Sequence, residues 1–137
     1  MDWYFEDKLF APTEEELSVW QGFVYEIEEI DTGMKYIGKK YFWKPKILPV
    51  TKTRKRRKKT LVESDWKDYF GSNKLLKENV SAKSVFNYNR KIIRLCETKG
   101  ECSYYEALYQ FQYSVILRED YYNEYIQCRI HSKHLKS

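Results

Sequence analysis

The sequence predicts an α+β fold in the order helix, strand, strand, loop, helix, strand, helix. Three observations indicate this order. Aromatic and β-branched residues flank a "DTG" turn signal at 31–33, which is typical of a hairpin. A third stretch of this kind lies within 86–96, and the longest helical pattern, 100–116, follows it. The length of 137 residues suits one domain, which we expect to span 1–137.

The N-terminal part should hold a short helix and then the hairpin. Residues 1–21 form a lead-in, in which Thr13 and Glu16 have the spacing of a capping box, so a short helix should begin there. Residues 22–30 and 34–42 should be the two strands, joined by the turn at 31–33.

Two tyrosines of this hairpin should share one face of the sheet. If the loop has two or four residues, the numbers of facing residues add up to 65, so that Lys40 faces Tyr25 and Glu29 faces Tyr36. A loop of three residues would break this parity. Side chains alternate between the two faces of a strand, and this parity places Tyr25 and Tyr36 together, offset along the strands.

The C-terminal half should alternate helix, strand and helix. Ser72 is expected to cap a helix over 73–80, and a buried strand lies within 86–96. The spacing of Ser103 and Glu106 predicts a second capping box for the helix at 100–116. The residues that fall on the expected core face of this helix are Leu108, Phe111 and Val115.

One segment carries most of the positive charge. The net charge is +5, yet residues 39–59 hold eleven Lys and Arg and no acidic residue, so the rest of the chain is net acidic. Such a concentration favours a local contact with a polyanion, although a solvated loop is the plainer interpretation. No clear period runs through 43–63, so we expect a mobile loop that extends by self-repulsion.

Cysteine usage and hydropathy restrict the compartment. Cys96, Cys102 and Cys128 form no CxxC pair, which argues against a disulfide framework and for a reducing compartment such as the cytoplasm. The acidic N-terminus does not look like a signal peptide, and no apolar run approaches the ~20 residues that span a bilayer.

The hairpin resembles the GIY-YIG nuclease superfamily. "FVY" at 23–25 stands for the first motif and "YIG" at 36–38 matches the second. Further blocks are similar to the phage Seg-type GIY-YIG endonuclease domain, a homing-endonuclease-like branch, over a core of about 20–130. These blocks are "YIGKKYFW", "ESDWKDYFGSNKLLKENV", "IIRLCETKGECSYYEALYQF" and "YYNEYI".

The resemblance implies a small antiparallel three-stranded sheet flanked by helices and a divalent-metal-dependent DNA endonuclease in a bacterial host's cytoplasm. It implies Tyr25 and Tyr36 as catalytic tyrosines, Glu106 as the ligand of Mg²⁺ or Mn²⁺, and Asn123 as a further polar site residue. Val24 replaces the isoleucine that is usual in the first motif.

An arginine is missing at the position where many members carry one. Position 46 is lysine, and the nearest arginines are Arg54, Arg56 and Arg57. Either one of these reaches the site, since guanidinium grips phosphate in a bidentate manner, or Lys40 takes part of the role. The remaining cations of the basic segment should bind DNA phosphates: Lys39, Lys44, Lys46, Lys52, Lys55, Lys58 and Lys59.

The expected chemistry needs specific environments. Tyr25 would act as general base or position the water, and its ordinary pKa near ~10 would require a neighbouring cation, which the expected register supplies as Lys40. A single carboxylate, Glu106, suits Mg²⁺, which keeps most of its water ligands.

Plainer interpretations stand beside these. Tyr25 and Tyr36 could be packing residues, Glu106 could only close a capping box, and Asn123 could be a turn residue. A zinc site at Cys128, His131 and His134 would lack a fourth ligand.

The alternative function is a non-catalytic nucleic-acid-binding protein that keeps the same frame, and the missing arginine is its main argument. Few residues remain after the core for a separate DNA-binding region. Recognition would therefore use residues 39–59, or specificity is low, or a protein partner supplies targeting.

Overall fold

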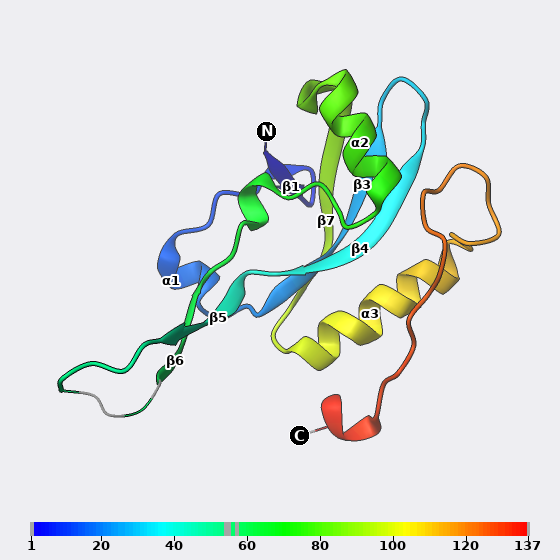
Figure 1. The fold of residues 1–137 in the computed structure, drawn as a ribbon. Coiled ribbons are helices and arrows are strands. Elements are labelled where there is room, and N and C mark those ends of the chain that lie inside the picture. Colours follow the sequence, from blue (N-terminus) through cyan, green and yellow to red (C-terminus); the bar gives the residue numbers. More distant parts are fainter. Residues whose placement is uncertain (1, 54–55, 57, 137) are drawn as a thin grey trace.

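The computed structural model describes residues 2–53, 56 and 58–136, with only the backbone of Lys58. The fold is α+β, with a mixed five-stranded sheet in the order β2-β1-β7-β3-β4 and a separate two-stranded sheet of β5 and β6 (Figure 1). The strands are β1 (Trp3–Phe5), β2 (Lys8–Leu9), β3 (Gly22–Glu29), β4 (Lys35–Tyr41), β5 (Trp43–Leu48), β6 (Lys58–Glu63) and β7 (Tyr88–Cys96). The helices are α1 (Glu14–Leu17), α2 (Lys74–Lys83) and α3 (Lys99–Gln112), with short 3-10 turns at Trp66–Asp68, Val85–Asn87 and Ser132–His134.

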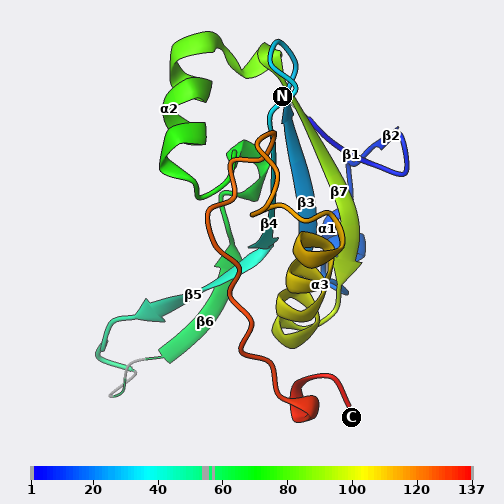
Figure 2. The same ribbon diagram turned by 90° about the vertical axis from the view of Figure 1, so that its right-hand side faces the viewer.

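The sheet lies between two layers with separate cores. Figure 2 shows α2 and α3 on opposite faces of the sheet. The α2 face is aromatic, with Trp3, Phe23 and Phe42 buried among the rings, and the Trp3 and Phe23 rings pack edge-on at 4.9 Å. The α3 face packs smaller side chains, among them Val24 and Ile37. Successive side chains of β3 and β4 therefore pack alternately into the two cores.

The predicted sheet of three strands was too small. Residues 3–5, expected to be part of a lead-in, form β1, which runs parallel to β7 and pairs Trp3 with Arg90. Sequence pattern could not find this strand because it is only three residues long. The short helix after Thr13 is confirmed, capping box included, and Leu17 is buried as expected.

The hairpin forms, but its register differs from the predicted one by two residues. Tyr25 faces Gly38, Phe23 faces Lys40, and the facing numbers add up to 63. The loop has four residues, one of the two expected lengths, but it spans 30–33, one residue earlier than a sum of 65 requires, because Glu29 N–H donates to the Met34 carbonyl. The parity is unchanged, so Tyr25 and Tyr36 do share one face, with ring centroids 6.2 Å apart.

A β-bulge lies beside the first tyrosine. Val24 faces Arg94 on β7 while Tyr25 faces Ile92, so Ile93 is the extra residue. A bulge bends its strand and re-aims the side chains around it, and bulges are frequent beside functional sites.

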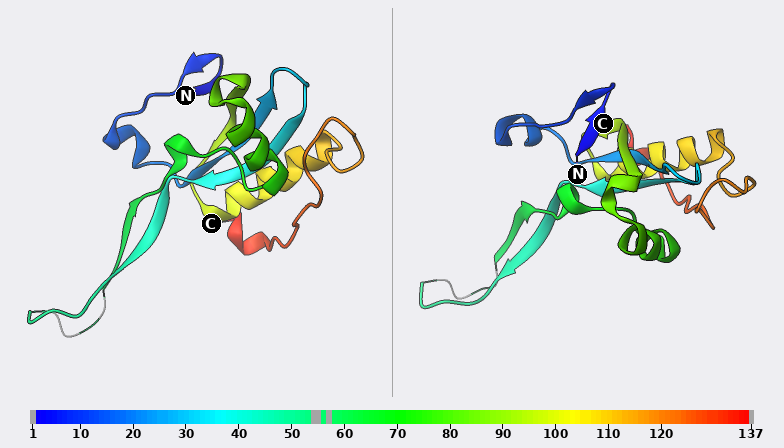
Figure 3. Two further views of the ribbon diagram at one scale, coloured as in Figure 1. Left: turned by 45° about the horizontal axis from the view of Figure 1, so that its top comes forward. Right: turned by 90° about the horizontal axis from the view of Figure 1, so that it is seen from above.

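The basic segment is not the loop that its charge density predicted. β5 and β6 form an antiparallel ribbon that extends away from the main sheet (Figure 3). Only Phe42 separates the end of β4 from the start of β5. We refer to β5 and β6 together as the ribbon.

Two helix starts also differ from prediction. Asn73, not Ser72, caps α2 by accepting the Leu76 N–H. Helix α3 begins at Lys99 under a Thr98 cap, so Ser103 and Glu106 lie inside the helix and form no capping box. Of the residues predicted for its core face, Val115 is buried, whereas Leu108 and Phe111 are exposed because Cys102, Ala107 and Gln110 face the sheet.

Within the described residues, no helix combines the length and apolar character that crossing a membrane requires.

Candidate functional site

Strand β4 is an edge of the five-stranded sheet, and its outward backbone groups organise the candidate site. The segment after α3 covers the first part of this edge. Lys35 N–H donates to the Asp120 carbonyl at 2.9 Å, and Tyr122 N–H donates to the Lys35 carbonyl at 2.7 Å. This pairing satisfies groups that an edge strand otherwise leaves open.

Asn123 continues the cover with its side chain. Its Oδ1 accepts the Ile37 N–H at 3.1 Å, and its Nδ2 donates to the Ile37 carbonyl at 2.8 Å. Gln110 of α3 donates a second hydrogen bond to the same carbonyl at 2.9 Å. The amide of Asn123 thus takes the place of a neighbouring strand, and its side chain is committed to holding β4 in position.

The next outward group of the edge belongs to Lys39, and its N–H donates to the carboxylate of Glu106. Three outward N–H groups of β4 therefore have three kinds of acceptor. Lys35 donates to a backbone carbonyl, Ile37 to a side-chain amide and Lys39 to a carboxylate. The backbone N–H groups of β4 point outward at every second residue, and α3 lies beside this edge. Glu106 is therefore located where the segment after α3 no longer covers the edge.

A pocket of about 310 Å³ lies at this opening. It straddles the edge of β4, taking residues from both faces of the sheet. Its lining consists of polar and charged side chains for the most part: Tyr36, Lys39, Ser72, Asn73, Lys74, Glu106, Gln110, Asn123, Glu124, Tyr125 and Gln127. Three predicted site residues, Tyr36, Glu106 and Asn123, thus converge on one pocket.

The electrostatics of Glu106 suit a ligand-binding carboxylate. Burial raises the pKa of Glu106, while the charge and the backbone N–H of Lys39 act in the opposite direction. Among the described residues, no lysine or arginine forms a salt bridge with Glu106. A half-buried carboxylate without an ion-pair partner is costly, and a cation in the pocket would offset that cost.

The other donors of the pocket are hard oxygen groups, as Mg²⁺ and Mn²⁺ prefer. Glu124 supplies a second carboxylate, and Tyr36 and Ser72 supply hydroxyls. Within the described part of the chain, no three or more His, Cys, Asp or Glu side chains gather closely enough to hold a metal ion. The arrangement therefore fits an ion that keeps most of its water, and it gives no support to zinc at Cys128, His131 and His134.

Tyr36 joins strand β4 to the start of α2. Its hydroxyl lies 2.9 Å from Ser72 Oγ. Burial raises the pKa of Tyr36, so its hydroxyl stays protonated at neutral pH. Gly71 makes this approach feasible, since its φ of 89° favours glycine and a Cβ there would lie 3.3 Å from the Tyr36 ring.

Tyr25 lies behind the pocket rather than in its lining. Its side chain is fully buried, and its hydroxyl rests against Gly38, where a Cβ would approach within 2.5 Å of Tyr25 Oη. The glycine that ends "YIG" is therefore required by the tyrosine of the facing strand. Burial raises the pKa of Tyr25 well above its ordinary value, and Tyr69 and Tyr36 add to the rise.

The cation expected beside Tyr25 is elsewhere. Lys40 Nζ lies 2.7 Å from Asp65 Oδ1 and 4.1 Å from the centre of the Tyr69 ring. The predicted pair of Lys40 and Tyr25 was wrong because the four-residue loop begins one residue earlier than the register assumed, which shifts the pairing by two residues. Without that cation and with a raised pKa, Tyr25 is a proton donor in this structure, not a ready general base.

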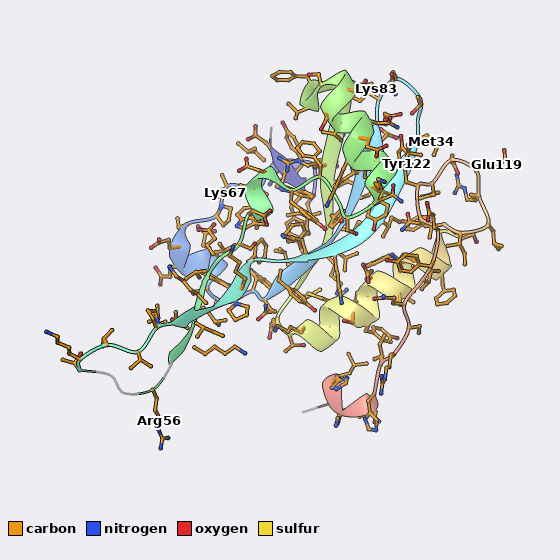
Figure 4. The ribbon with its side chains drawn as sticks, in the orientation of Figure 1. Met34, Arg56, Lys67, Lys83, Glu119 and Tyr122 are labelled. Carbon is orange, nitrogen blue, oxygen red and sulfur yellow. The ribbon has the colours of Figure 1, made fainter. Side chains whose placement is uncertain are left out.

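The arginine candidates do not reach the pocket where they can be placed. Arg56 lies at the far end of the ribbon, pointing away from the body of the protein (Figure 4). Arg54 and Arg57 lie outside the described residues, as does Lys55. The cations in the pocket lining are instead Lys39 and Lys74. Lys39 was expected only to bind DNA, and Lys74 was not predicted because nothing in the sequence brings α2 against β4.

A buried carboxylate at the other end of the hairpin anchors the segment that carries Asn123. Glu29 accepts hydrogen bonds from Tyr88 Oη at 2.6 Å and Tyr122 Oη at 2.9 Å. Lys83 Nζ lies 2.9 Å from its other oxygen. Lys83 comes from α2 and Tyr122 from the segment after α3 (Figure 4). This cluster lies outside the pocket, but it fixes the position of the segment that carries Asn123.

Comparison with known proteins identifies one family. No curated protein and no solved structure gives a significant match to the chain. A family model does match, over residues 3–126, and its description reads "Putative endonuclease segE, GIY-YIG domain". The match covers both tyrosine strands, α3 with Glu106, and Asn123. The chain therefore belongs to the SegE GIY-YIG domain family of endonucleases.

Proposed function

We propose that this protein is a divalent-metal-dependent endonuclease that hydrolyses phosphodiester bonds of DNA in the pocket at the edge of β4. The observation that carries the proposal is the convergence of Tyr36, Lys39 and Glu106 on one polar pocket, in a chain of a GIY-YIG endonuclease family. Phosphodiester hydrolysis needs charge stabilisation at the phosphate and a positioned water, and these residues supply groups for both.

Glu106 would hold a Mg²⁺ or Mn²⁺ ion, with Glu124 as the second carboxylate of the pocket. Such an ion supplies charge neutralisation and lowers the pKa of bound water. Metal binding requires the ionised carboxylate, so the raised pKa of Glu106 makes the site weaker as pH falls.

Phosphate would be held by the groups opposite Glu106. Lys39 and Lys74 are the cations of the lining, and α2 begins at Lys74, so the start of this helix lies at the pocket. Helix N-termini favour phosphate through these N–H groups and the helix dipole. Tyr36, protonated at neutral pH, would donate a hydrogen bond to a phosphate oxygen or to the attacking water.

Tyr25 would contribute as a hydrogen-bond donor, because its raised pKa excludes a substantial tyrosinate population at neutral pH. Its hydroxyl faces the backbone of Gly38, one residue before Lys39.

A non-catalytic DNA-binding role is the second candidate, and one observation favours it. Among the described residues, the pocket lining contains no arginine, which leaves Lys39 and Lys74 to stabilise charge without bidentate geometry. This candidate predicts DNA binding that is indifferent to Mg²⁺ and no cleavage.

Plasmid cleavage in Mg²⁺ and in EDTA distinguishes the two. We expect the wild type to nick or cut plasmid in Mg²⁺ only. Glu106→Gln should lose cleavage and keep DNA binding, whereas Glu78→Gln, which removes the same charge from an exposed position of α2, should behave like the wild type. Binding without cleavage by the wild type would establish the second candidate.

A further inference from the structure

We propose that the ribbon of β5 and β6 is a DNA-binding arm that enters the major groove of the duplex whose backbone lies in the pocket. The inference rests on the proposed function for the identity of the polymer. It adds the element that recognises the duplex and the side of the pocket on which recognition takes place. A separate DNA-binding domain would then be unnecessary for duplex contact.

The ribbon is fixed to the sheet at its base. Trp43 Nε1 donates to the Trp20 carbonyl at 3.0 Å. Ser64, directly after β6, donates its N–H to the Phe42 carbonyl and its hydroxyl to the Tyr41 carbonyl, each at 2.7 Å. The start of β5 and the end of β6 are thus both held against the β4 side of the molecule, so the ribbon has a defined direction relative to the pocket.

The two faces of the ribbon differ in chemistry. The register pairs Lys44 with Val62 and Lys46 with Thr60, which places both lysines on one face, exposed. The opposite face carries an apolar group made of Pro45, Ile47 and Leu61, and one lysine, Lys59, which faces Ile47. Pro45 faces Leu61, and Ile47 and Leu61 are each about three-fifths exposed. An apolar group of this kind on a projecting element indicates a contact surface.

A lysine-lined hollow connects the pocket to the ribbon. A second pocket of about 250 Å³ shares Lys39 with the first and extends to Lys44 and Pro45. Lys39 Nζ and Lys99 Nζ each lie 5.5 Å from the centre of the Tyr41 ring. A polyanion that passes from the Glu106 pocket to the ribbon would meet Lys39, Lys99 and Lys44. Asp65 also lines this hollow, and Lys40 neutralises it at 2.7 Å.

Charge and shape favour duplex DNA as the occupant. No acidic residue occurs between 36 and 62, so this entire stretch attracts an anionic polymer. The major groove, about 12 Å wide, admits a two-stranded ribbon. There, one face directs lysines to a phosphate backbone, and the apolar face can contact base edges such as thymine methyl groups.

The length of the strand sets the distance between the two contacts. Ile47 lies eight positions after Lys39, and a strand rises about 3.3 Å per residue, so these two positions are at most about 26 Å apart. That length corresponds to roughly 8 base pairs at 3.4 Å each. Binding should therefore be asymmetric, and the contacts up to Ile47 should lie within one helical turn of the cleaved bond on the ribbon side.

Binding to a 40-base-pair duplex in EDTA tests the arm without any cleavage. The variant is Lys44→Gln/Lys46→Gln, and the matched control is Lys8→Gln/Lys91→Gln, which removes the same charge from exposed lysines of β2 and β7. We expect the ribbon variant to weaken binding and to reduce the slope of log K against log salt by about 1.8, while the control changes it little. Equal slopes for both variants would overturn the proposal.

The apolar face has its own test. Ile47→Ser/Leu61→Ser should weaken binding and leave the salt slope unchanged, because it removes no phosphate contact. Methyl green, a major-groove ligand, should compete with the protein, and netropsin, a minor-groove ligand, should not. Competition by netropsin alone would overturn the groove assignment. Self-association of the free protein that the Ser variant abolishes, with unchanged DNA binding, would assign this face to a second copy and overturn the proposal.

The two proposals fail separately. DNA binding with the expected loss in the lysine variant, but no cleavage in Mg²⁺, supports the arm and refutes the nuclease. If the ribbon variant and its control both cleave DNA and both bind it with the affinity and salt slope of the wild type, the arm is refuted and the nuclease proposal is unaffected.

Discussion

Replacing Glu29 with glutamine should destabilise the protein by about 3 kcal/mol. Burial alone would raise the pKa of Glu29, but hydrogen bonds from Thr32, Tyr88, Lys83 and Tyr122 outweigh it and hold the pKa at about 2, against an ordinary 4.5. One pKa unit corresponds to 1.36 kcal/mol, which gives the figure of about 3 kcal/mol. Glutamine keeps the shape, loses the charge, and turns one acceptor into a donor.

The pH dependence has a defined direction. Because the folded-state pKa of Glu29 is lowered, its contribution to the free energy of unfolding is complete above about pH 4.5 and is lost as pH falls towards 2. Glu29→Gln cannot show this loss, so the difference between the two proteins should shrink across this window.

Urea unfolding followed by tryptophan fluorescence measures the effect. At a slope of about 2 kcal/mol per molar urea, we expect the midpoint of Glu29→Gln to fall by about 1.5 M at pH 7. The control is Glu28→Gln, whose half-buried partner Lys35 lies 4.0 Å away, and it should cost under about 1 kcal/mol. A Glu29→Gln variant as stable as the control, or a difference that persists unchanged at pH 2, would refute the reasoning.

Three further changes test the pocket and its supports. Gly38→Ala should cost roughly 1–3 kcal/mol, because its Cβ would meet Tyr25 Oη at 2.5 Å and Cζ at 2.8 Å, and Tyr25→Phe should relieve only part of that strain in thermal unfolding. Tyr25→Phe alone should fold normally and cleave plasmid roughly 10²-fold more slowly, and wild-type cleavage would reduce Tyr25 to a packing residue. Asn123→Ala should cost roughly 2 kcal/mol in urea unfolding, since it leaves both backbone groups of Ile37 without this partner, and an unchanged midpoint would contradict its bridging role.

The sequence was sufficient for features that depend on local pattern. Alternation along the hairpin placed Tyr25 and Tyr36 on one face, and the spacing of Thr13 and Glu16 located the first helix. The resemblance placed Tyr36, Glu106 and Asn123 in one site, and they do line one pocket. Whether they act as the resemblance implies stays a prediction.

What failed depends on geometry that residue types do not encode. The register followed from a four-residue turn, in which Gly33 adopts a φ of 75°, and a two-residue difference moved Lys40 away from Tyr25. The ribbon was missed because charge density outweighed the weak alternation of lysines and apolar residues in β5. Lys74 entered the site only through the packing of α2 beside β4, which is a tertiary contact.

The central claim is that Glu106 makes the pocket at the edge of β4 a phosphodiester-cleaving site. Single-turnover cleavage at saturating protein, with DNA affinity measured in parallel, tests it most directly because binding and chemistry are then separated. The account predicts that Glu106→Gln cleaves at least ~10²-fold more slowly in Mg²⁺, with affinity within about twofold of the wild type. Wild-type cleavage by this variant would contradict the account.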